Sequence, residues 1–362
     1  METTLHRVYY GDSRDLGHLD DGSVDFVLTS PPYPMIPMWD ASFARQDDEI
    51  GRMLDNGDGA GAFRRMHALL DPVWRECFRL LRPGGMACIN IGDAVRTLNG
   101  RFGLYPNHAA ILTACTGIGF TALPLILWRK QTNAPNKFMG SGMLPAGAYV
   151  TLEHEYVLIF RKGDKREFAS EADRQRRKES AIFWEERNAW FSDVWLDLKG
   201  TGQGLPDAAV RRRSGAFPFE LAYRLIQMFS VRGDTVLDPF AGTGTSVFAA
   251  MASGRHSIGV ELESGLHTAV ASGVGTVRST ANARISARLS SHLAFIRERF
   301  QDPETIAHVN RPYGFAVVTR QETDLVLFPV HRIRKTGEHT FEVDYVPEAV
   351  IDPKGYEQRM LF

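Results

Sequence analysis

The sequence of 362 residues is poor in cysteine and has no long apolar run. Its three cysteines, Cys77, Cys88 and Cys115, fit neither zinc-ligand spacing nor a disulfide framework, which favours a reduced compartment. Because no stretch of about 18 apolar residues occurs, we expect no membrane span. The first residues also lack the charged-then-apolar layout of a secretory signal peptide.

An excess of one charge sign is missing as well, since 42 Lys and Arg residues balance 43 Asp and Glu residues to a net charge of −1. This balance argues against a protein that coats nucleic acid through bulk electrostatics. Two local basic clusters stand out, residues 161–178 and the consecutive Arg211, Arg212 and Arg213. Acidic residues are interleaved in the first cluster, and each cluster alone is typical of a solvated surface.

Short apolar runs rich in β-branched residues predict seven buried strands. These runs are Val8–Tyr10, Phe26–Thr29, Met86–Ile91, Leu123–Trp128, Tyr156–Phe160, Thr235–Asp238 and Ser257–Glu261. Helical patterns lie between them at residues 63–81, 108–116, 218–229 and 245–252. Strands that alternate with helices predict an α/β fold with a mostly parallel sheet.

Three segments do not follow this alternation. Residues 34–62 are rich in Gly, Asp and Met and predict a long loop, and residues 161–210 are first charged and then aromatic. Residues 265–362 begin with a predicted helix to about Arg299. Strand-like runs follow at 314–319, 325–330 and 340–346, which predict a small accessory β unit.

A glycine loop, Asp238-Pro-Phe-Ala-Gly-Thr-Gly-Thr-Ser246, follows one predicted strand and opens a predicted helix. Its glycines let a ligand approach the backbone, and a helix N-terminus favours an anionic group. A P-loop would need Gly-Lys-Ser/Thr, and a dinucleotide fingerprint would need glycine in place of Val247, so neither ATP nor NAD is favoured. Glu261 ends the next strand, where an acid in nucleotide-binding α/β folds holds ribose hydroxyls.

A second motif, Thr29-Ser-Pro-Pro-Tyr33, ends the predicted strand Phe26–Thr29. Two prolines fix φ and remove N–H donors, which leaves carbonyl oxygens pointing outward on a rigid turn. The Ser30 hydroxyl and the Pro31 carbonyl can accept hydrogen bonds from an amino group, and the Tyr33 ring can stack on a base. Alone, the motif is also compatible with a stiff turn and a core tyrosine.

Together the two motifs resemble those of the DNA amino-methyltransferases, which modify adenine N6 or cytosine N4. The resemblance covers most of residues 5–262 and includes Gly11-Asp-Ser13, Leu81–Gly85, Glu153–Lys162 and Phe217-Pro218. Because the proline turn precedes the glycine loop, the motif order resembles the beta group, a circular permutation of the common fold. The resemblance implies a Rossmann-like S-adenosylmethionine-dependent methyltransferase fold with a seven-stranded, mostly parallel sheet, in which the strands at Phe26 and Thr235 are neighbours.

The resemblance also implies which residues form the site. The catalytic residues would be Ser30, Pro31, Pro32 and Tyr33. The residues binding S-adenosyl-L-methionine would be Asp12, Ser13, Phe217, Pro218, Asp238, Phe240, Ala241, Gly242, Thr243, Gly244, Thr245, Glu261 and Leu262. No metal ligands are expected, and we interpret His154 with Glu153 and Glu155 as structural.

Ser30 at the first motif position, together with the extension 34–40, resembles the cytosine-N4 type. The implied activity is site-specific methylation of cytosine N4, on a base flipped out of duplex DNA. Methylation of adenine N6 is the alternative. Methylation of RNA or protein, or a non-catalytic DNA-binding protein, is less favoured.

The resemblance further implies a catalytic core at residues 1–262 and an attached helix with the accessory β unit at 263–362. Target recognition is expected in residues 161–213, with residues 129–149 as a rival, and the loop 34–62 could close over the flipped base. We expect a cytoplasmic enzyme of a prokaryotic cell without membrane contact. A homodimer and a separately encoded cognate restriction endonuclease are left open.

Overall fold

The structure, a computed structural model, describes residues 3–130, 139–199, 217–299 and 307–346. The strands are β1 (Thr3–Tyr10), β2 (Val24–Thr29), β3 (Leu81–Ile91), β4 (Ala94–Leu98), β5 (Arg101–Tyr105), β6 (Phe120–Arg129), β7 (Met139–Gly140), β8 (Ala148–Tyr149), β9 (His154–Lys162), β10 (Val194–Trp195), β11 (Thr235–Asp238), β12 (His256–Glu261), β13 (His308–Val309), β14 (Ala316–Val317), β15 (Val330–Gly337) and β16 (Thr340–Tyr345). The helices are η1 (Pro37–Trp39), α1 (Asp40–Gln46), α2 (Asp48–Asp55), α3 (Gly59–Leu80), α4 (Asn107–Ile118), α5 (Glu171–Glu179), α6 (Trp184–Trp190), α8 (Phe219–Phe229), α9 (Thr245–Ala252), η2 (Ser264–Leu266), α10 (His267–Arg299) and η4 (Arg320–Glu322).

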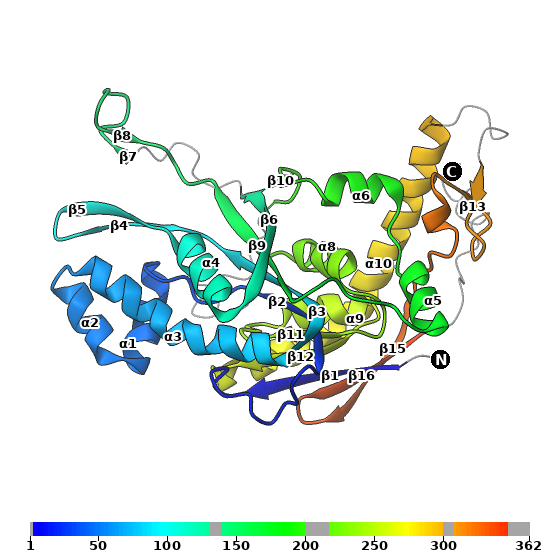
Figure 1. The fold of residues 1–362 in the computed structure, drawn as a ribbon, viewed down its shortest axis with the longest axis horizontal. Coiled ribbons are helices and arrows are strands. Elements are labelled where there is room, and N and C mark those ends of the chain that lie inside the picture. The colour runs from blue at the N-terminus through cyan, green and yellow to red at the C-terminus, as the bar shows by residue number, and fades with distance from the viewer. Residues whose placement is uncertain (1–2, 131–138, 200–216, 300–306, 347–362) are drawn as a thin grey trace.

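A ten-stranded sheet runs through the molecule in the order β10-β6-β9-β3-β2-β11-β12-β1-β16-β15 (Figure 1). The five strands from β3 to β1 in this order are mutually parallel, whereas β9 is antiparallel to both β3 and β6. The seven predicted strands form the middle of the sheet, and Val236 of β11 pairs with Phe26 of β2. The predicted fold class and the predicted neighbourhood of these two strands are therefore confirmed.

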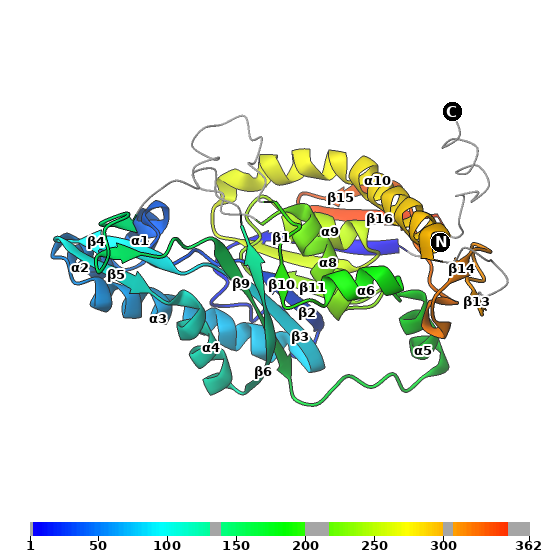
Figure 2. The same ribbon diagram turned by 90° about the horizontal axis from the view of Figure 1, so that it is seen from above.

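Alternating side chains of the sheet build two separate hydrophobic cores, because successive residues of a strand point to opposite faces. On β2, Phe26 and Leu28 belong to one buried cluster with Val236. Val27 between them belongs to the other cluster with Leu237. Helices α3 and α4 cover the Val27 face, and α8, α9 and α10 cover the Phe26 face, as seen from above in Figure 2.

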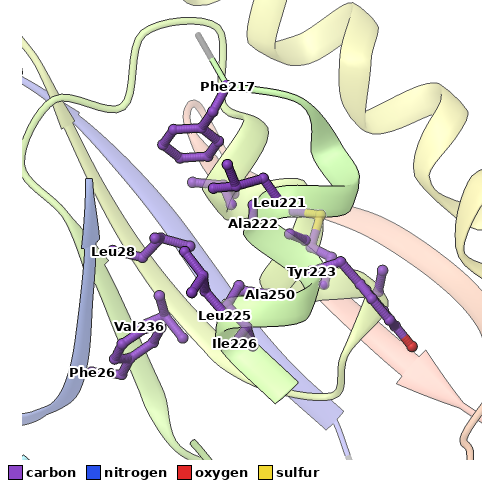
Figure 3. Packing of buried hydrophobic residues seen from close by; sticks show 14 of the residues in the cluster. Phe26, Leu28, Phe217, Leu221, Ala222, Tyr223, Leu225, Ile226, Val236 and Ala250 are labelled. Carbon is purple, nitrogen blue, oxygen red and sulfur yellow. The ribbon is translucent and has the colours of Figure 1, made fainter. Parts of the chain in front are cut away.

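Helix α8 shows how the Phe26 face is filled. Its Leu221 and Leu225 are fully buried and face Phe26 and Leu28 of β2, with Val236 of β11 beside them (Figure 3). Each fully buried side chain of this size contributes about 1.5–3 kcal/mol relative to an exposed one. This packing fixes the ends of β2 and β11 relative to each other, and both motifs begin at these ends.

The prediction of a long loop at residues 34–62 is wrong, because η1, α1, α2 and the first turn of α3 occupy this segment. Two aspartates act as helix N-caps: Asp47 accepts a hydrogen bond from the Glu49 backbone N–H, and Asp58 accepts one from Gly61. Buried Phe43 anchors α1 to the core. The Gly and Asp content that suggested a loop belongs to the caps and helix junctions.

The tail also differs from the expectation of a small accessory β unit. The predicted helix to Arg299 is present as α10, but β15 and β16 extend the central sheet through antiparallel pairing of β16 with β1. Only Val330 of the strand-like run 325–330 lies in a strand, and the run 314–319 contains the short β14, paired with β13. The sheet therefore recruits strands from both ends of the sequence.

Candidate active site

The strand order reverses between β2 and β11, and the two sequence motifs meet at this point. Thr29, the last residue of β2, donates its hydroxyl proton to Asp238, the last residue of β11, over 2.6 Å. Ligands of open α/β sheets bind beyond the carboxyl ends of the strands at such a reversal. The two motifs, far apart in the sequence, therefore form one site.

A cavity of about 610 Å³ lies beyond these strand ends. Its wall contains fifteen of the seventeen predicted site residues: Asp12, Ser13, Ser30, Pro31, Pro32, Tyr33, Phe217, Asp238, Phe240, Ala241, Gly242, Thr243, Thr245, Glu261 and Leu262. The other two, Pro218 and Gly244, are the N-caps of α8 and α9 and are not part of the wall. A Cβ at Gly244 would meet the Phe248 ring at 3.0 Å, so this glycine faces its own helix.

The glycine loop is held by the buried carboxylate of Asp238. This carboxylate accepts hydrogen bonds from Thr29, from the Phe240 backbone N–H at 2.9 Å and from the Ser246 hydroxyl. Burial raises the pKa of Asp238 to about 6, and its hydrogen-bond donors oppose this rise. Gly242 has a φ of +52°, a left-handed conformation that favours glycine at the tip of the loop.

Two acidic residues frame the cavity from β12 and β1. Glu261 accepts backbone N–H bonds from Gly242 and from Glu263, both at 2.8 Å, and burial raises the pKa of its carboxyl. Asp12, after β1, is bonded by Arg14, and this hydrogen bond lowers the pKa of Asp12. The cavity thus offers two carboxylates in different environments, one bound to the loop backbone and the other paired with a guanidinium.

The proline turn forms the opposite wall of the cavity and is tied down by its tyrosine. The Tyr33 hydroxyl donates to Glu155 Oε2 at 3.0 Å and accepts from Asn90 Nδ2 at 2.9 Å and from Ser30 Oγ at 3.1 Å. Burial, followed by the charge of Glu155, raises the pKa of the Tyr33 phenol well above its usual range. The Tyr33 phenol is therefore neutral, and its hydroxyl takes part in three hydrogen bonds.

The sequence does not predict that polar residues stand behind this turn. Glu155, for which the sequence indicates a structural role, lines the cavity, and Lys130 of the rival recognition segment lines it as well. Asn90 is fully buried on β3. Its signal in the sequence is a lone amide within the apolar run Met86–Ile91, because a buried amide needs partners.

The helices found at residues 34–62 supply the outer wall of the cavity. Its lining includes Trp39, Phe43 and Gln46, and Arg45 of α1 forms an ion pair with Glu263 beyond β12. Met35 at the start of this segment is buried with a φ of +67°, a strained conformation for a residue with a side chain. The strain occurs where the chain leaves the proline turn.

The described part of the expected recognition segment, residues 161–199, is anchored to the body of the protein by a few buried residues, while much of it is exposed. Its Phe183, Trp190 and Trp195 are buried in the hydrophobic clusters, and Arg166 forms two hydrogen bonds with Asp234. These aromatic rings stabilise the fold. The Arg211–Arg213 cluster and much of the rival segment, residues 131–138, lie outside the described residues, so the recognition assignment stays a prediction.

One polar cluster within the described ranges has metal-ligand chemistry: atoms of Glu185, His292 and Glu322 lie within 4.8 Å of one another. His292 bonds to Glu185 at 2.8 Å and to the Ala316 carbonyl at 2.9 Å. Glu322 accepts bonds from Thr319 and from the Trp184 backbone. None of the three lines the cavity, and their hydrogen bonds join α6 to α10 and α6 to η4.

Within the described helices, none is long and apolar enough to cross a membrane. The family model described as DNA methylase, for the N6 and N4 enzymes, matches residues 24–272. Type II methyltransferase M.MthZI of Methanothermobacter thermautotrophicus is 46% identical over 362 residues, covering 100% of this chain and 99% of the relative. Type II methyltransferase M.MjaI of Methanocaldococcus jannaschii is 47% identical, over 75% of this chain and 92% of the relative.

Solved structures of similar proteins share this architecture. One is TTHA0409 of Thermus thermophilus, described as a DNA modification methylase and complexed with S-adenosyl-L-methionine; it has a TM-score of 0.58, 33% identity, and coverage of 75% of this chain and 94% of that one. PvuII DNA methyltransferase, described as cytosine-N4-specific, has a TM-score of 0.54 and covers 75% of this chain and 86% of its own. Its identity of 17% supports the likeness of fold alone.

Proposed function

This chain belongs to the N6/N4 family of DNA methylases, and from that premise we propose that it methylates cytosine N4 in duplex DNA. The observation that carries the proposal is the position of the Ser30-Pro-Pro-Tyr33 turn, which lines the same cavity as the glycine loop and Glu261. A methyl donor and an amino acceptor can meet there. Like the relatives M.MthZI and M.MjaI, the chain would be a type II DNA methyltransferase.

The cofactor of this family is S-adenosyl-L-methionine, which supplies a methyl group on an electrophilic sulfonium. The cavity fits this cofactor because it combines a glycine loop, carboxylates and apolar rings. Glu261 would accept hydrogen bonds from the ribose hydroxyls. Its carboxylate also accepts hydrogen bonds from two backbone N–H groups, which hold it at the cavity. Asp12 would lie near the adenine, and the other proposed contacts are Ser13, Phe217, Phe240, Ala241, Gly242, Thr243, Thr245 and Leu262. Asp238 would hold the loop, and Pro218 and Gly244 would support the site as the N-caps of α8 and α9.

The catalytic turn would act on the target base by position more than by acid-base chemistry. An exocyclic amine is a poor nucleophile, because its lone pair is delocalised into the ring. Ser30 Oγ and the Pro31 carbonyl would accept the amine protons and turn the lone pair toward the methyl group, while Pro32 keeps the turn rigid. Tyr33 would stack on a base flipped out of the duplex. Such positioning can contribute roughly 7–11 kcal/mol to lowering the barrier.

The choice of cytosine N4 rests on Ser30. A serine at this position of the motif resembles the motif of the cytosine-N4 enzymes. Adenine N6 is the alternative, since a serine can serve either amine. Recognition of a specific DNA site would fall to residues 161–213 or 129–149. Action in the prokaryotic cytoplasm, a homodimer and a separately encoded restriction endonuclease complete the proposal.

The proposal is tested by incubating the full chain with duplex DNA and S-adenosyl-L-methionine, and digesting the DNA to nucleosides. Mass analysis should find N4-methylcytosine; N6-methyladenine alone would refute the proposed base. Sequencing the same DNA would give the recognised site. RNA of the same sequence serves as the control substrate.

The role of Tyr33 is tested separately with a Tyr33→Ala variant. Because stacking of a base on an aromatic ring is worth about 1–3 kcal/mol, we expect the rate of methyl transfer to fall about 5- to 150-fold. Binding of S-adenosyl-L-methionine, measured by calorimetry, should persist. Full methyl transfer in this variant would contradict the stacking role.

A further inference from the structure

A buried carboxylate stands behind the catalytic turn, although the proposed chemistry assigns it no part. Glu155 on β9 is 9% exposed and receives three donors: the Tyr33 hydroxyl at 3.0 Å, Asn90 Nδ2 at 2.7 Å and Lys130 Nζ at 2.9 Å. Burying a carboxylate is costly unless it is paired and hydrogen-bonded. Here both oxygens have partners, and Lys130 supplies the opposite charge.

These contacts fix the direction of every hydrogen bond around Tyr33. An ionised carboxylate only accepts, so the Tyr33 hydroxyl must donate its single proton to Glu155. The Tyr33 oxygen then has only lone pairs left, and it receives the amide proton of Asn90 at 2.9 Å and the hydroxyl proton of Ser30 at 3.1 Å. The chain of O–H groups thus runs from Ser30 through Tyr33 to Glu155.

The orientation matters for Ser30, which would have to accept a proton from the target amine. A serine hydroxyl carries one proton and two lone pairs. When its proton points to Tyr33, the lone pairs are left for the cavity. When Tyr33 donates to Ser30 instead, the Ser30 proton must find another acceptor, and it would compete with the amine protons.

We propose that Glu155 is a positioning residue for methyl transfer: held by Lys130 and Asn90, it orients the Tyr33 and Ser30 hydroxyls so that Ser30 presents lone pairs to the amine. This inference rests on the proposed function and adds a determinant outside the catalytic motif. It also gives Tyr33 two separable roles. The ring stacks on the base, and the hydroxyl transmits the orientation set by Glu155.

The hydrogen-bond chain can be interrupted at Glu155 or at the Tyr33 hydroxyl without removing the Tyr33 ring. Glu155→Gln keeps the shape of the side chain, but its amide can donate where the carboxylate only accepts. Tyr33→Phe keeps the ring and deletes the hydroxyl. Hydrogen bonds to charged groups and supporting contacts of site residues suggest a fall in kcat of about ten- to a hundredfold for each variant. KM for DNA and the Kd for S-adenosyl-L-methionine should stay within about twofold.

The decisive measurement is the double variant Tyr33→Phe/Glu155→Gln. Because either change already breaks the same chain, the double variant should lose no more activity than the more impaired single variant. Multiplied losses would overturn the proposal, and so would full activity of Glu155→Gln. Glu153→Gln is the matched control, since this carboxylate pairs with Arg129 and does not line the cavity; its kcat should not change.

Two further measurements keep the outcome decisive. Thermal unfolding and cofactor binding check that each variant is folded. If Glu155→Gln does not fold, the test rests on Tyr33→Phe, and an unchanged kcat in that variant would overturn the proposal. Activity is counted as labelled methyl groups transferred to DNA, whichever base receives them. Methylation of adenine by the parent enzyme would therefore refute the proposed base and leave the test of Glu155 intact.

Discussion

Replacing Glu261 with glutamine tests whether the cavity binds its cofactor as proposed. Both Glu261 oxygens already accept backbone N–H bonds, from Gly242 and from Glu263, at 2.8 Å each. The carboxylate thus shapes the glycine loop and would also receive the ribose hydroxyls. Glutamine has the same shape but only one accepting oxygen.

The expected loss follows from counting these hydrogen bonds. Hydrogen bonds to a charged group contribute about 1.5–3 kcal/mol and neutral ones about 0.5–1.5 kcal/mol. The substitution therefore weakens the two hydrogen bonds from the ribose hydroxyls by about 2 kcal/mol in total. This corresponds to a roughly thirtyfold weaker Kd. One backbone N–H also loses its acceptor, which lowers the free energy of unfolding by about 1–3 kcal/mol.

Isothermal titration calorimetry of S-adenosyl-L-methionine, with the parent and the Glu261→Gln variant, measures the first loss, and urea unfolding measures the second. Glu171→Gln is the control, because this side chain is 82% exposed and pairs only with Arg174 among the contacts described. A Kd of Glu261→Gln within twofold of the parent would show that Glu261 is not a cofactor ligand. A tighter Kd would refute the charge argument itself.

Three further predictions concern the loop and the core. Gly242→Val forces a β-branched residue to a φ of +52°, so calorimetry should detect no cofactor binding, while the far-ultraviolet circular dichroism stays that of the parent. Burial raises the pKa of Asp238 to about 6, so its ionised form destabilises the folded state by about 3 kcal/mol above that pH. The lost stability returns as the pH falls towards 4 and the folded protein becomes protonated at Asp238. In urea unfolding, the stability of Asp238→Asn relative to the parent should therefore be higher at pH 7.5 than at pH 4.5, and an equal difference at both would contradict the assignment. Arg288→Met leaves the Glu186 carboxylate unpaired in the core and should cost about 3–5 kcal/mol, whereas adding Glu186→Leu should recover part of this loss.

The parts of the fold that depend on local pattern could be predicted from the sequence. Strands that are buried on both faces read as continuous apolar runs, and such runs predict all seven central strands, including the antiparallel β9. Each motif is recognisable from residues close together in the chain, and the resemblance that the motifs carry implies the remaining site residues. Fifteen of the seventeen residues line one cavity.

The missed parts depend on contacts between distant residues. Glu155 reaches Tyr33 because β9 lies beside β3, with Ile91 opposite Tyr156, and no local pattern encodes that pairing. The β15–β16 hairpin joins the sheet only because β1 leaves an edge free. In the helices of residues 34–62, helix caps and the burial of Phe43 outweigh a loop-like composition.

The pairing of β1 has a consequence for how the protein folds on the ribosome. β1 is synthesised before both of its sheet partners, because β12 and β16 are residues 256–261 and 340–345. Until they are synthesised, both edges of β1 lack partners, and such long-range pairing is slow and leaves strands open to aggregation. The strand that leads to Asp12 cannot take its place beside Glu261 before β12 has been synthesised. A nascent chain should therefore remain inactive at least until β12 has been synthesised, and the unpaired edges of β1 should be open to aggregation during that interval.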